Sequence, residues 1–257
     1  MAARYPLLEA WRACKPSAPP FILPGDEALL AEPALWAVEQ WRDYVANTER
    51  GNPADAGKLC LGLLPMPFVG NLRTASIFLL MLNPGARPHD FFGESEVPEY
   101  RNELLATLRQ DDGIDGLLDP RFAWHGRYGY WEGKLSKLFA RIAGGGATYG
   151  TARHDLQSRM AALELVPYHS TRYALPGRVM KKLKSVELMR SFVSDVVIPR
   201  ARAGDALVII GRAADRWGKF PKSKNIVAYS GTAARSAHLT PDSPGGKAIL
   251  RFLAAGS

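Results

Sequence analysis

Four short apolar segments constrain the fold of this 257-residue chain more than any other feature of its sequence. They are residues 76–82, 161–166, 206–210 and 226–229. Apart from Glu164, the first three are continuously apolar and end in turn residues, which is typical of parallel strands covered on both faces. Helical patterns lie between or after them, at 97–109, 131–143, 186–203 and 245–253. This alternation predicts an α/β fold with a mostly parallel, four-stranded sheet.

The rest of the chain gives no sign of a domain boundary or an internal repeat, so we expect one domain over residues 1–257. Residues 1–25 contain five prolines and are predicted to form an irregular N-terminal arm on the surface. Apolar residues at helical spacing predict an amphipathic helix over 27–47, with Pro33 as a break or as the start of its longer part.

Composition narrows the class of protein. No apolar run approaches the ~20 residues that a membrane helix needs, and charged residues interrupt the N-terminal segment, so we expect a cytoplasmic protein without a membrane partner. The two cysteines, Cys14 and Cys60, belong to no metal-binding spacing, and neither a metal site nor a disulfide is expected. The net charge of +8 is concentrated in 171–190 and 212–224. It indicates either a basic face for a polyanion or an ordinary solvated surface.

Candidate site residues follow the expected strands, because ligands of open α/β sheets bind beyond the carboxyl ends of the strands. In the loop 237–249, Ser243 and Pro244 fit the cap and first position of a helix, while the exposed amides of 243–247 would also suit a phosphate. Both interpretations stay open. The residues to inspect are Asn83-Pro84-Gly85, Tyr168-His169-Ser170, Arg212 and the loop 237–249.

Two motifs resemble those of the uracil-DNA glycosylase superfamily. "LLMLNPG" at 79–85 is similar to the first active-site motif of its Asn-Pro-Gly branches, and "HLTPDSP" at 238–244 is similar to its second motif. "PMPFVGN" at 65–71 and "LELVPYHS" at 163–170 resemble segments near its first and second strands. The resemblance implies a single three-layer α/β/α sandwich domain with a four-stranded central sheet. It also implies a monomeric DNA-repair enzyme that acts on single- or double-stranded DNA. Such an enzyme flips a base out of the DNA and hydrolyses its N-glycosidic bond without a metal or cofactor.

On this resemblance, Asn83 holds the attacking water through its side-chain amide, and His238 donates a hydrogen bond to the departing base. Phe91 or Phe92 stacks on the flipped base. Gly85 and Glu164 complete the predicted base-binding residues. The residues assigned to DNA binding are Thr240, Ser243, Gly245, Lys247 and Arg212.

Two residues depart from the family pattern. Glu164 stands where relatives that read uracil often have an amide, and a carboxylate would prefer a base with exposed donors. Asp242 stands where relatives carry an apolar wedge, for which Leu239 would have to substitute. Three alternatives therefore stay open: a diverged member that binds nucleic acid, a nucleobase or a nucleotide without cleavage, a hydrolase of small nucleosides, and an α/β protein without a nucleic-acid role.

Overall fold

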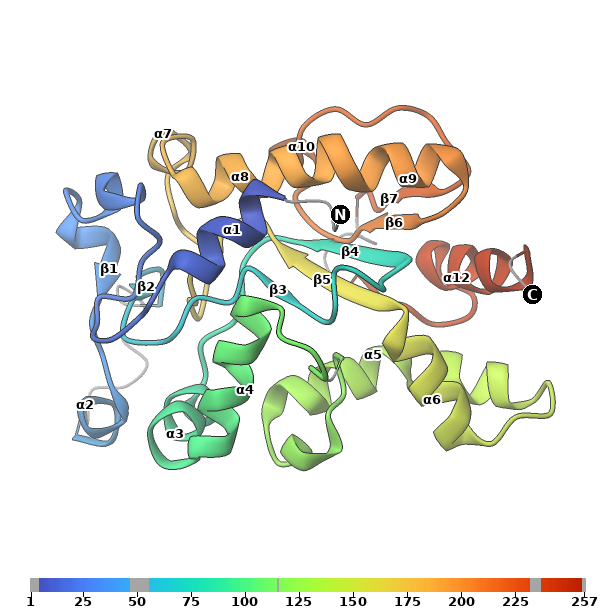
Figure 1. Cartoon of the computed structure of the whole chain (residues 1–257), viewed down its shortest axis with the longest axis horizontal. Helices are drawn as coiled ribbons and strands as arrows, with labels where there is room; N and C mark the ends of the chain where they lie inside the picture. Colours follow the sequence, from blue (N-terminus) through green and yellow to red (C-terminus); the bar gives the residue numbers. More distant parts are fainter. Residues whose placement is uncertain (1–4, 47–55, 115, 232–236, 256–257) are drawn as a thin grey trace. The chain divides into compact units, whose positions relative to one another are not determined.

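The computed structural model describes residues 5–46, 56–114, 116–231 and 237–255 (Figure 1). The chain divides into two compact units, and each is built from three separate stretches. The first unit comprises residues 1–68, 83–112 and 164–192, and the second comprises 69–82, 113–163 and 193–257. The expected single domain stays a prediction.

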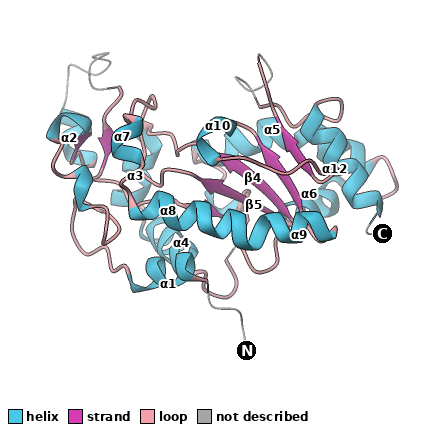
Figure 2. Cartoon of the chain, turned by 90° about the horizontal axis from the view of Figure 1, so that it is seen from above, coloured by secondary structure: helices cyan, strands magenta, loops and turns pink. Residues whose placement is uncertain are grey.

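Among the described residues, the main sheet has five strands in the order β3-β5-β4-β6-β7. Figure 2 shows β4 and β5 side by side. β4 pairs with β6 and β6 with β7, both in parallel, as predicted. The predicted number of four strands is wrong, because β3 is too short, at two residues in a Pro-rich segment, to leave a period-2 pattern. The strands are β3 (Phe68–Val69), β4 (Ile77–Met81), β5 (Met160–Glu164), β6 (Leu207–Ile210) and β7 (Ile226–Ala228).

The buried strands explain the apolar segments of the sequence. Every residue of β4, β5 and β6 is buried. All of β4, β6 and β7, and β5 up to Leu163, belong to the second unit. In that unit α9 contacts β6, α12 contacts β6 and β7, and α5 contacts α6. The α-helices described in this unit are α5 (Gly126–Ala143), α6 (Tyr149–Ser158), α9 (Ile198–Ala203), α10 (Ala214–Trp217) and α12 (Pro244–Ala255).

The first unit is mainly helical. A two-stranded parallel sheet pairs β1 (Trp36–Ala37) with β2 (Leu59–Cys60). Helix α1 contacts both α4 and α8, and α3 contacts α2 and α4. The helices are α1 (Pro6–Ala13), α2 (Trp41–Ala46), α3 (Pro88–Glu96), α4 (Pro98–Arg109), α7 (Gly177–Met180) and α8 (Lys184–Phe192).

The predicted irregular arm over residues 1–25 is wrong for Pro6–Ala13, which form α1. Its Leu7, Leu8 and Trp11 are buried, with Trp11 0% exposed. Pro6 occupies the first helical turn, where its fixed φ favours helix formation and its missing N–H costs nothing. The prolines that follow Ala13 hide a short amphipathic helix from a composition-based prediction.

The predicted helix over 27–47 is wrong for residues 27–40 and confirmed for 41–46, while residue 47 lies outside the described residues. Residues 27–29 and 33–35 form single 3-10 turns, Trp36 is extended, and α2 begins only at Trp41. Pro33 explains the interruption, because proline disfavours the α conformation of the residue before it, and Glu32 has φ −122° and ψ 70°.

The predicted helix over 186–203 is interrupted at residues 193–197, which form a π-helical turn between α8 and α9. Pro199 explains the change of winding, since it has no N–H to donate to the carbonyl four residues earlier.

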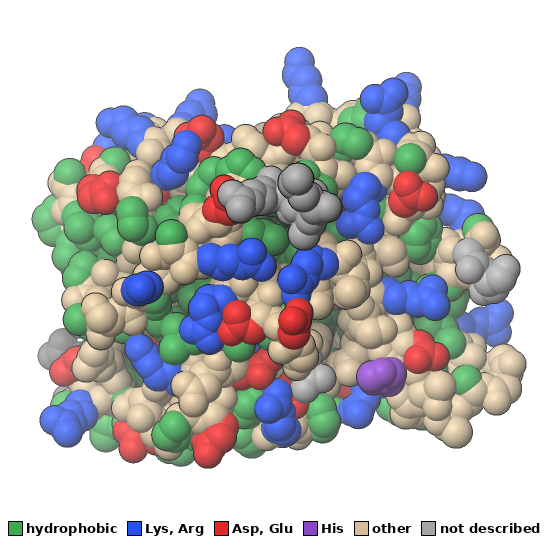
Figure 3. Space-filling view, viewed as in Figure 1, with side chains coloured by type: hydrophobic (Ala, Val, Ile, Leu, Met, Phe, Trp, Pro, Cys, Tyr) green, Lys and Arg blue, Asp and Glu red, His purple; other side chains and the backbone are tan. Residues whose placement is uncertain are grey.

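No helix among the described residues is both long and apolar enough to cross a membrane. On the face shown in Figure 3, Lys and Arg side chains are interspersed with Asp and Glu.

Candidate functional site

Two of the loops singled out in the sequence are joined in the first unit. The loop after β4 and the loop after β5 meet in a parallel bridge between Gly85 and Ser170. The Ser170 amide donates to the Pro84 carbonyl at 3.1 Å, and the Ala86 amide donates to the Ser170 carbonyl at 3.1 Å. Asn-Pro-Gly is therefore more than a turn, because its backbone pairs with a segment 85 residues further along the chain.

The side chain of Asn83 lies at this junction and is half-buried. Its Nδ2 donates to the carbonyls of Pro84 and Tyr168, at 3.0 and 3.2 Å, and to the Ser170 hydroxyl at 2.8 Å. A flipped amide would set Oδ1 against two carbonyl oxygens, so the neighbours determine the orientation. None of the residues that the structure describes donates a hydrogen bond to Asn83 Oδ1. That oxygen is a fixed acceptor for a water or a ligand.

Gly85 and His169 complete the junction. The His169 ring donates from Nδ1 to the Gly85 carbonyl at 2.6 Å, since a carbonyl can only accept, and this contact sets the tautomer of a neutral ring. Gly85 is exposed, and an added Cβ would meet no atom within 4 Å. Its φ is not in the left-handed region. The fold itself therefore does not require glycine at this position.

Behind the junction, Tyr168 reaches a buried acid that the sequence analysis missed. The Tyr168 hydroxyl donates to the Asp26 carboxylate and accepts from the Leu23 amide at 3.1 Å, while the Ser185 amide donates to Asp26 at 3.0 Å. Asp26 is 0% exposed, and burial raises its pKa above the ordinary value. Burial and the charge of Asp26 likewise raise the pKa of Tyr168. Because the Tyr168 carbonyl accepts from Asn83, this network supports the residue that orients the amide.

The two phenylalanines proposed to bind a base occupy different environments. Phe91 is 3% exposed, packs with Leu63 and Ala86, and stacks on Tyr44 with ring centroids 4.7 Å apart. Its assignment as a stacking platform is wrong for this structure, because the ring has no accessible face. Phe92 is 39% exposed and makes an edge-to-face contact with Trp41, with ring centroids 5.5 Å apart, so it is the candidate of the pair.

Glu164 ends β5 and belongs to the first unit. It is 8% exposed, and its backbone amide donates to the Pro67 carbonyl at 2.8 Å. Glu164 is thus a buried acid at the end of an otherwise apolar strand. A base-binding role for its carboxylate stays a prediction.

The second motif lies in the second unit, where the loop before α12 presents an exposed His238. The backbone around this histidine is held on both sides. Lys134 Nζ donates to the Ala237 carbonyl at 3.1 Å, and the Tyr229 hydroxyl donates to the His238 carbonyl. Ala237 has a left-handed φ of 44°, which fixes the direction of the chain just before the imidazole.

The start of α12 decides between the two interpretations of this loop. Ser243 Oγ accepts from the Gly246 amide at 3.1 Å and donates to the Thr240 carbonyl at 2.7 Å. The Gly245 amide donates to the Tyr229 hydroxyl at 3.0 Å, and the Lys247 amide donates to the Ser243 carbonyl at 2.9 Å. The capping interpretation is confirmed. Phosphate binding by these amides is wrong, because each already has an internal acceptor. Contacts of the exposed Lys247 and Arg212 side chains with DNA stay predictions.

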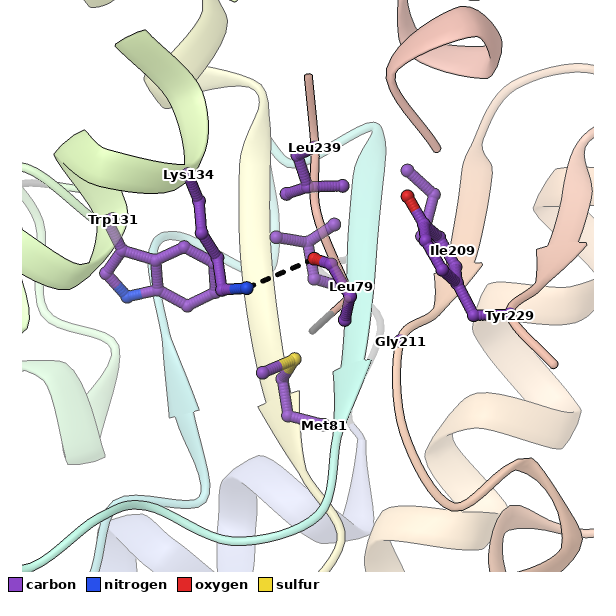
Figure 4. Close-up of a pocket in the computed structure, with 9 residues that line it drawn as sticks. Leu79, Met81, Trp131, Lys134, Ile209, Gly211, Tyr229 and Leu239 are labelled. Atoms are coloured by element: carbon purple, nitrogen blue, oxygen red, sulfur yellow. Dashed lines mark hydrogen bonds between the residues drawn. The ribbon is translucent and has the colours of Figure 1, made fainter. Parts of the chain in front are cut away.

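Leu239 cannot act as the predicted wedge in this structure, since it is 3% exposed. Figure 4 shows it beside Leu79, with Lys134 reaching the Ala237 carbonyl. The cavity that these residues line measures about 10 Å³ and has room for about one water. Burial, and secondarily the charge of Arg212, lowers the pKa of Lys134. Through its hydrogen bond to the Ala237 carbonyl, Lys134 supports the His238 loop. The sequence analysis could not identify this lysine, because it lies in α5 outside any motif.

The structure thus joins Asn83 and Gly85 with Tyr168, His169 and Ser170 in the first unit. It places His238 with Thr240, Ser243 and Gly245 in the second. Searches against protein-family models, curated proteins and solved structures each found no match to this chain. The chemistry of these side chains is therefore the basis for assigning a function.

Proposed function

We propose that this protein is a diverged member of the uracil-DNA glycosylase superfamily, with its three-layer α/β/α sandwich, and that it hydrolyses the N-glycosidic bond of uracil or another modified base in DNA. The observation that carries the proposal is the fixed side-chain amide of Asn83. Its Nδ2 is held by three acceptors, and its Oδ1 remains available in a loop that follows β4. In such a position an amide oxygen accepts a hydrogen bond from a water and aligns it with a sugar carbon.

The role of Asn83 is orientation. An amide has no proton-accepting pKa near neutrality, so it cannot be a general base. The rate must come from placing the water and from stabilising the two charges of an oxocarbenium-like transition state, one on the sugar and one on the leaving base. Because the Asn83 amide is already oriented, it places the water without having to reorganise during the reaction.

His238 is assigned from its sequence motif as the donor to the departing base. Two observations support this role. The imidazole is exposed, and the backbone around it is fixed by hydrogen bonds from Tyr229 to the His238 carbonyl and from Lys134 to the Ala237 carbonyl. A hydrogen bond to the developing anionic oxygen of the base strengthens as the glycosidic bond breaks, so it lowers the barrier more than it improves binding.

The choice of base is assigned to Glu164 and Phe92. The Glu164 carboxylate is buried, and an ionised carboxylate only accepts hydrogen bonds, so it would favour a base that presents an N–H or amino donor. The exposed ring of Phe92 would stack on the flipped base, a contact worth about 1–3 kcal/mol.

The experiment is a gel assay with labelled oligonucleotides that carry uracil, hypoxanthine or xanthine, both single- and double-stranded, followed by alkali to cut abasic sites. Wild type is compared with Asn83→Ala and His238→Ala. Asn102→Ala and His154→Ala are the matched controls, because both side chains are exposed and lie outside the two motifs.

We expect cleavage that falls by roughly 100-fold or more in the two motif variants, the scale of a lost transition-state hydrogen bond, and stays unchanged in the controls. Salt-dependent DNA binding by folded protein without any abasic product would instead favour the non-cleaving alternative. Equal cleavage by Asn83→Ala and wild type would refute the role of the amide.

A further inference from the structure

Helices α1 and α4 of the first unit pack together (Figure 1). A separate groove is lined by residues at and after the end of α1 and in the last turns of α4. Its volume is about 390 Å³, within the range of roughly 300–1,000 Å³ found for small-molecule sites. None of the residues of the Asn83 junction lines it. The site is therefore independent of the proposed glycosylase function.

The walls of the groove are aliphatic. Leu105 and Leu108 of α4 face it together with Pro16. Cys14 adds its thiol, whose pKa is raised first by burial and then by the charge of Asp26, so the sulfur stays protonated and acts as a small apolar group. Among the residues that the structure describes, no aromatic side chain lines the groove, so a flat base or other ring system would have no stacking partner there. An aliphatic chain matches these walls better.

Three cationic side chains line the groove. Arg109 is already neutralised by Asp111, with Nη2 and the carboxylate 2.8 Å apart. Arg12 donates from Nε to the Arg109 carbonyl at 2.7 Å, which holds the guanidinium at the groove. Within the described part of the chain, the terminal nitrogens of Arg12 and the amine of Lys15 form no hydrogen bond or ion pair. The groove thus has two uncompensated positive charges beside an aliphatic wall.

We propose that this groove binds a linear aliphatic carboxylate. The chain lies against Leu105, Leu108 and Pro16, and the head group pairs with Arg12 and Lys15. The guanidinium fork matches the two oxygens of a carboxylate, and charge-assisted hydrogen bonds of this kind are about twice as strong as neutral ones. Each methylene of the chain that is removed from water against these walls strengthens binding further.

The test is isothermal titration calorimetry of the full chain with decanoate below its micelle concentration, and with decanol and acetate as probes of the tail and the head alone. We expect decanoate to bind at least tenfold more tightly than either. A decanol affinity equal to that of decanoate would overturn the anionic assignment, and an equal acetate affinity would overturn the aliphatic one. No heat with decanoate would overturn the site.

Two variants locate the binding. Arg12→Met with Lys15→Met keeps the aliphatic stems but removes both charges, and it should weaken decanoate at least tenfold without changing decanol. The matched control, Lys137→Met with Arg141→Met, removes the same charge from exposed positions of α5. Leu105→Asp, at a half-buried position, should weaken decanoate to a similar extent by repulsion. Equal affinities in the charge variant and its control would overturn the proposal.

Discussion

Individual hydrogen bonds at Asn83 give a first test at the scale of single residues. In Asn83→Asp an oxygen replaces Nδ2 and faces the carbonyls of Pro84 and Tyr168. Unsatisfied or opposed buried acceptors cost about 1–3 kcal/mol, so we expect the free energy of unfolding to fall by this amount and cleavage to be lost. Urea denaturation and the gel assay measure the two effects. Ser170→Ala, which leaves both carbonyl acceptors in place, should lose about 1 kcal/mol and retain cleavage.

Gly85→Ala separates folding from ligand contact. An added Cβ would meet no atom within 4 Å and the backbone is not left-handed, so we expect stability to remain within about 0.5 kcal/mol of wild type. If a nucleotide approaches this backbone, the methyl group will block it and raise KM. Thermal denaturation and steady-state kinetics test this. Unchanged kinetics in the variant would argue against substrate contact at Gly85.

The buried Asp26 predicts a pH dependence of stability. Burial raises its pKa above the ordinary value of 3.8, although hydrogen bonds from Ser185 and Tyr168 oppose this shift. The folded state therefore holds the proton more tightly than the unfolded chain. The free energy of unfolding attributable to this group falls as pH rises from its ordinary pKa through its raised folded pKa.

Asp26→Asn removes that titration, so its free energy of unfolding should depend less on pH than that of wild type above about pH 4. Urea denaturation at a series of pH values measures the difference. Asp205→Asn, at an exposed position, is the control and should follow the wild-type curve. Parallel curves for wild type and Asp26→Asn would show that Asp26 does not titrate in this range.

At the scale of elements, the start of α12 depends on two glycines. A Cβ at Gly246 would lie 1.8 Å from the Thr240 carbonyl oxygen, and one at Gly245 would lie 2.7 Å from the Tyr229 hydroxyl. We expect Gly246→Ala to lower the free energy of unfolding by about 1–3 kcal/mol or more. Gly133→Ala, inside α5 with no atom within 4 Å, should raise it by about 0.5–1 kcal/mol. Chemical denaturation of both variants tests the contrast.

Elements with a strong local pattern could be predicted from the sequence. The four longer strands of the sheet match the predicted segments to within two residues at their ends, because both faces of β4, β5 and β6 are buried. Helix α4 was also predicted to within one residue. Short elements whose stability comes from tertiary contacts were not, and these include α1 and β3.

The same limit applies to the candidate site. The loops that follow β4 and β5 could be selected because strand ends carry ligands in α/β sheets. That Asn83 would donate to the Tyr168 carbonyl could not be predicted, since it depends on a pairing across 85 residues. The burial of Phe91 beside an exposed Phe92 depends likewise on a tertiary contact, the stacking of Phe91 on Tyr44 from a distant segment of the chain.

At the scale of the molecule, each unit draws on three stretches of chain. The fragment 1–112 retains Asp26 and Asn83 but lacks their partners in residues 164–192. We expect it to show no cooperative urea transition by circular dichroism, whereas the fragment 1–192, which holds all three stretches of the first unit, should keep one. A cooperative transition in 1–112 alone would mean that residues 164–192 are dispensable for the first unit.

The distance in sequence between Asn83 and Tyr168 also affects how the protein is made. Translation at about 5–20 residues per second separates the emergence of the two residues by about 4 to 17 s, because they are 85 positions apart. During this interval the nascent chain contains the apolar β4 before its neighbour β6 exists. Until the partners of the Asn83 amide have been synthesised, the apolar residues of β4 in the nascent chain therefore have to be shielded by other molecules at the ribosome.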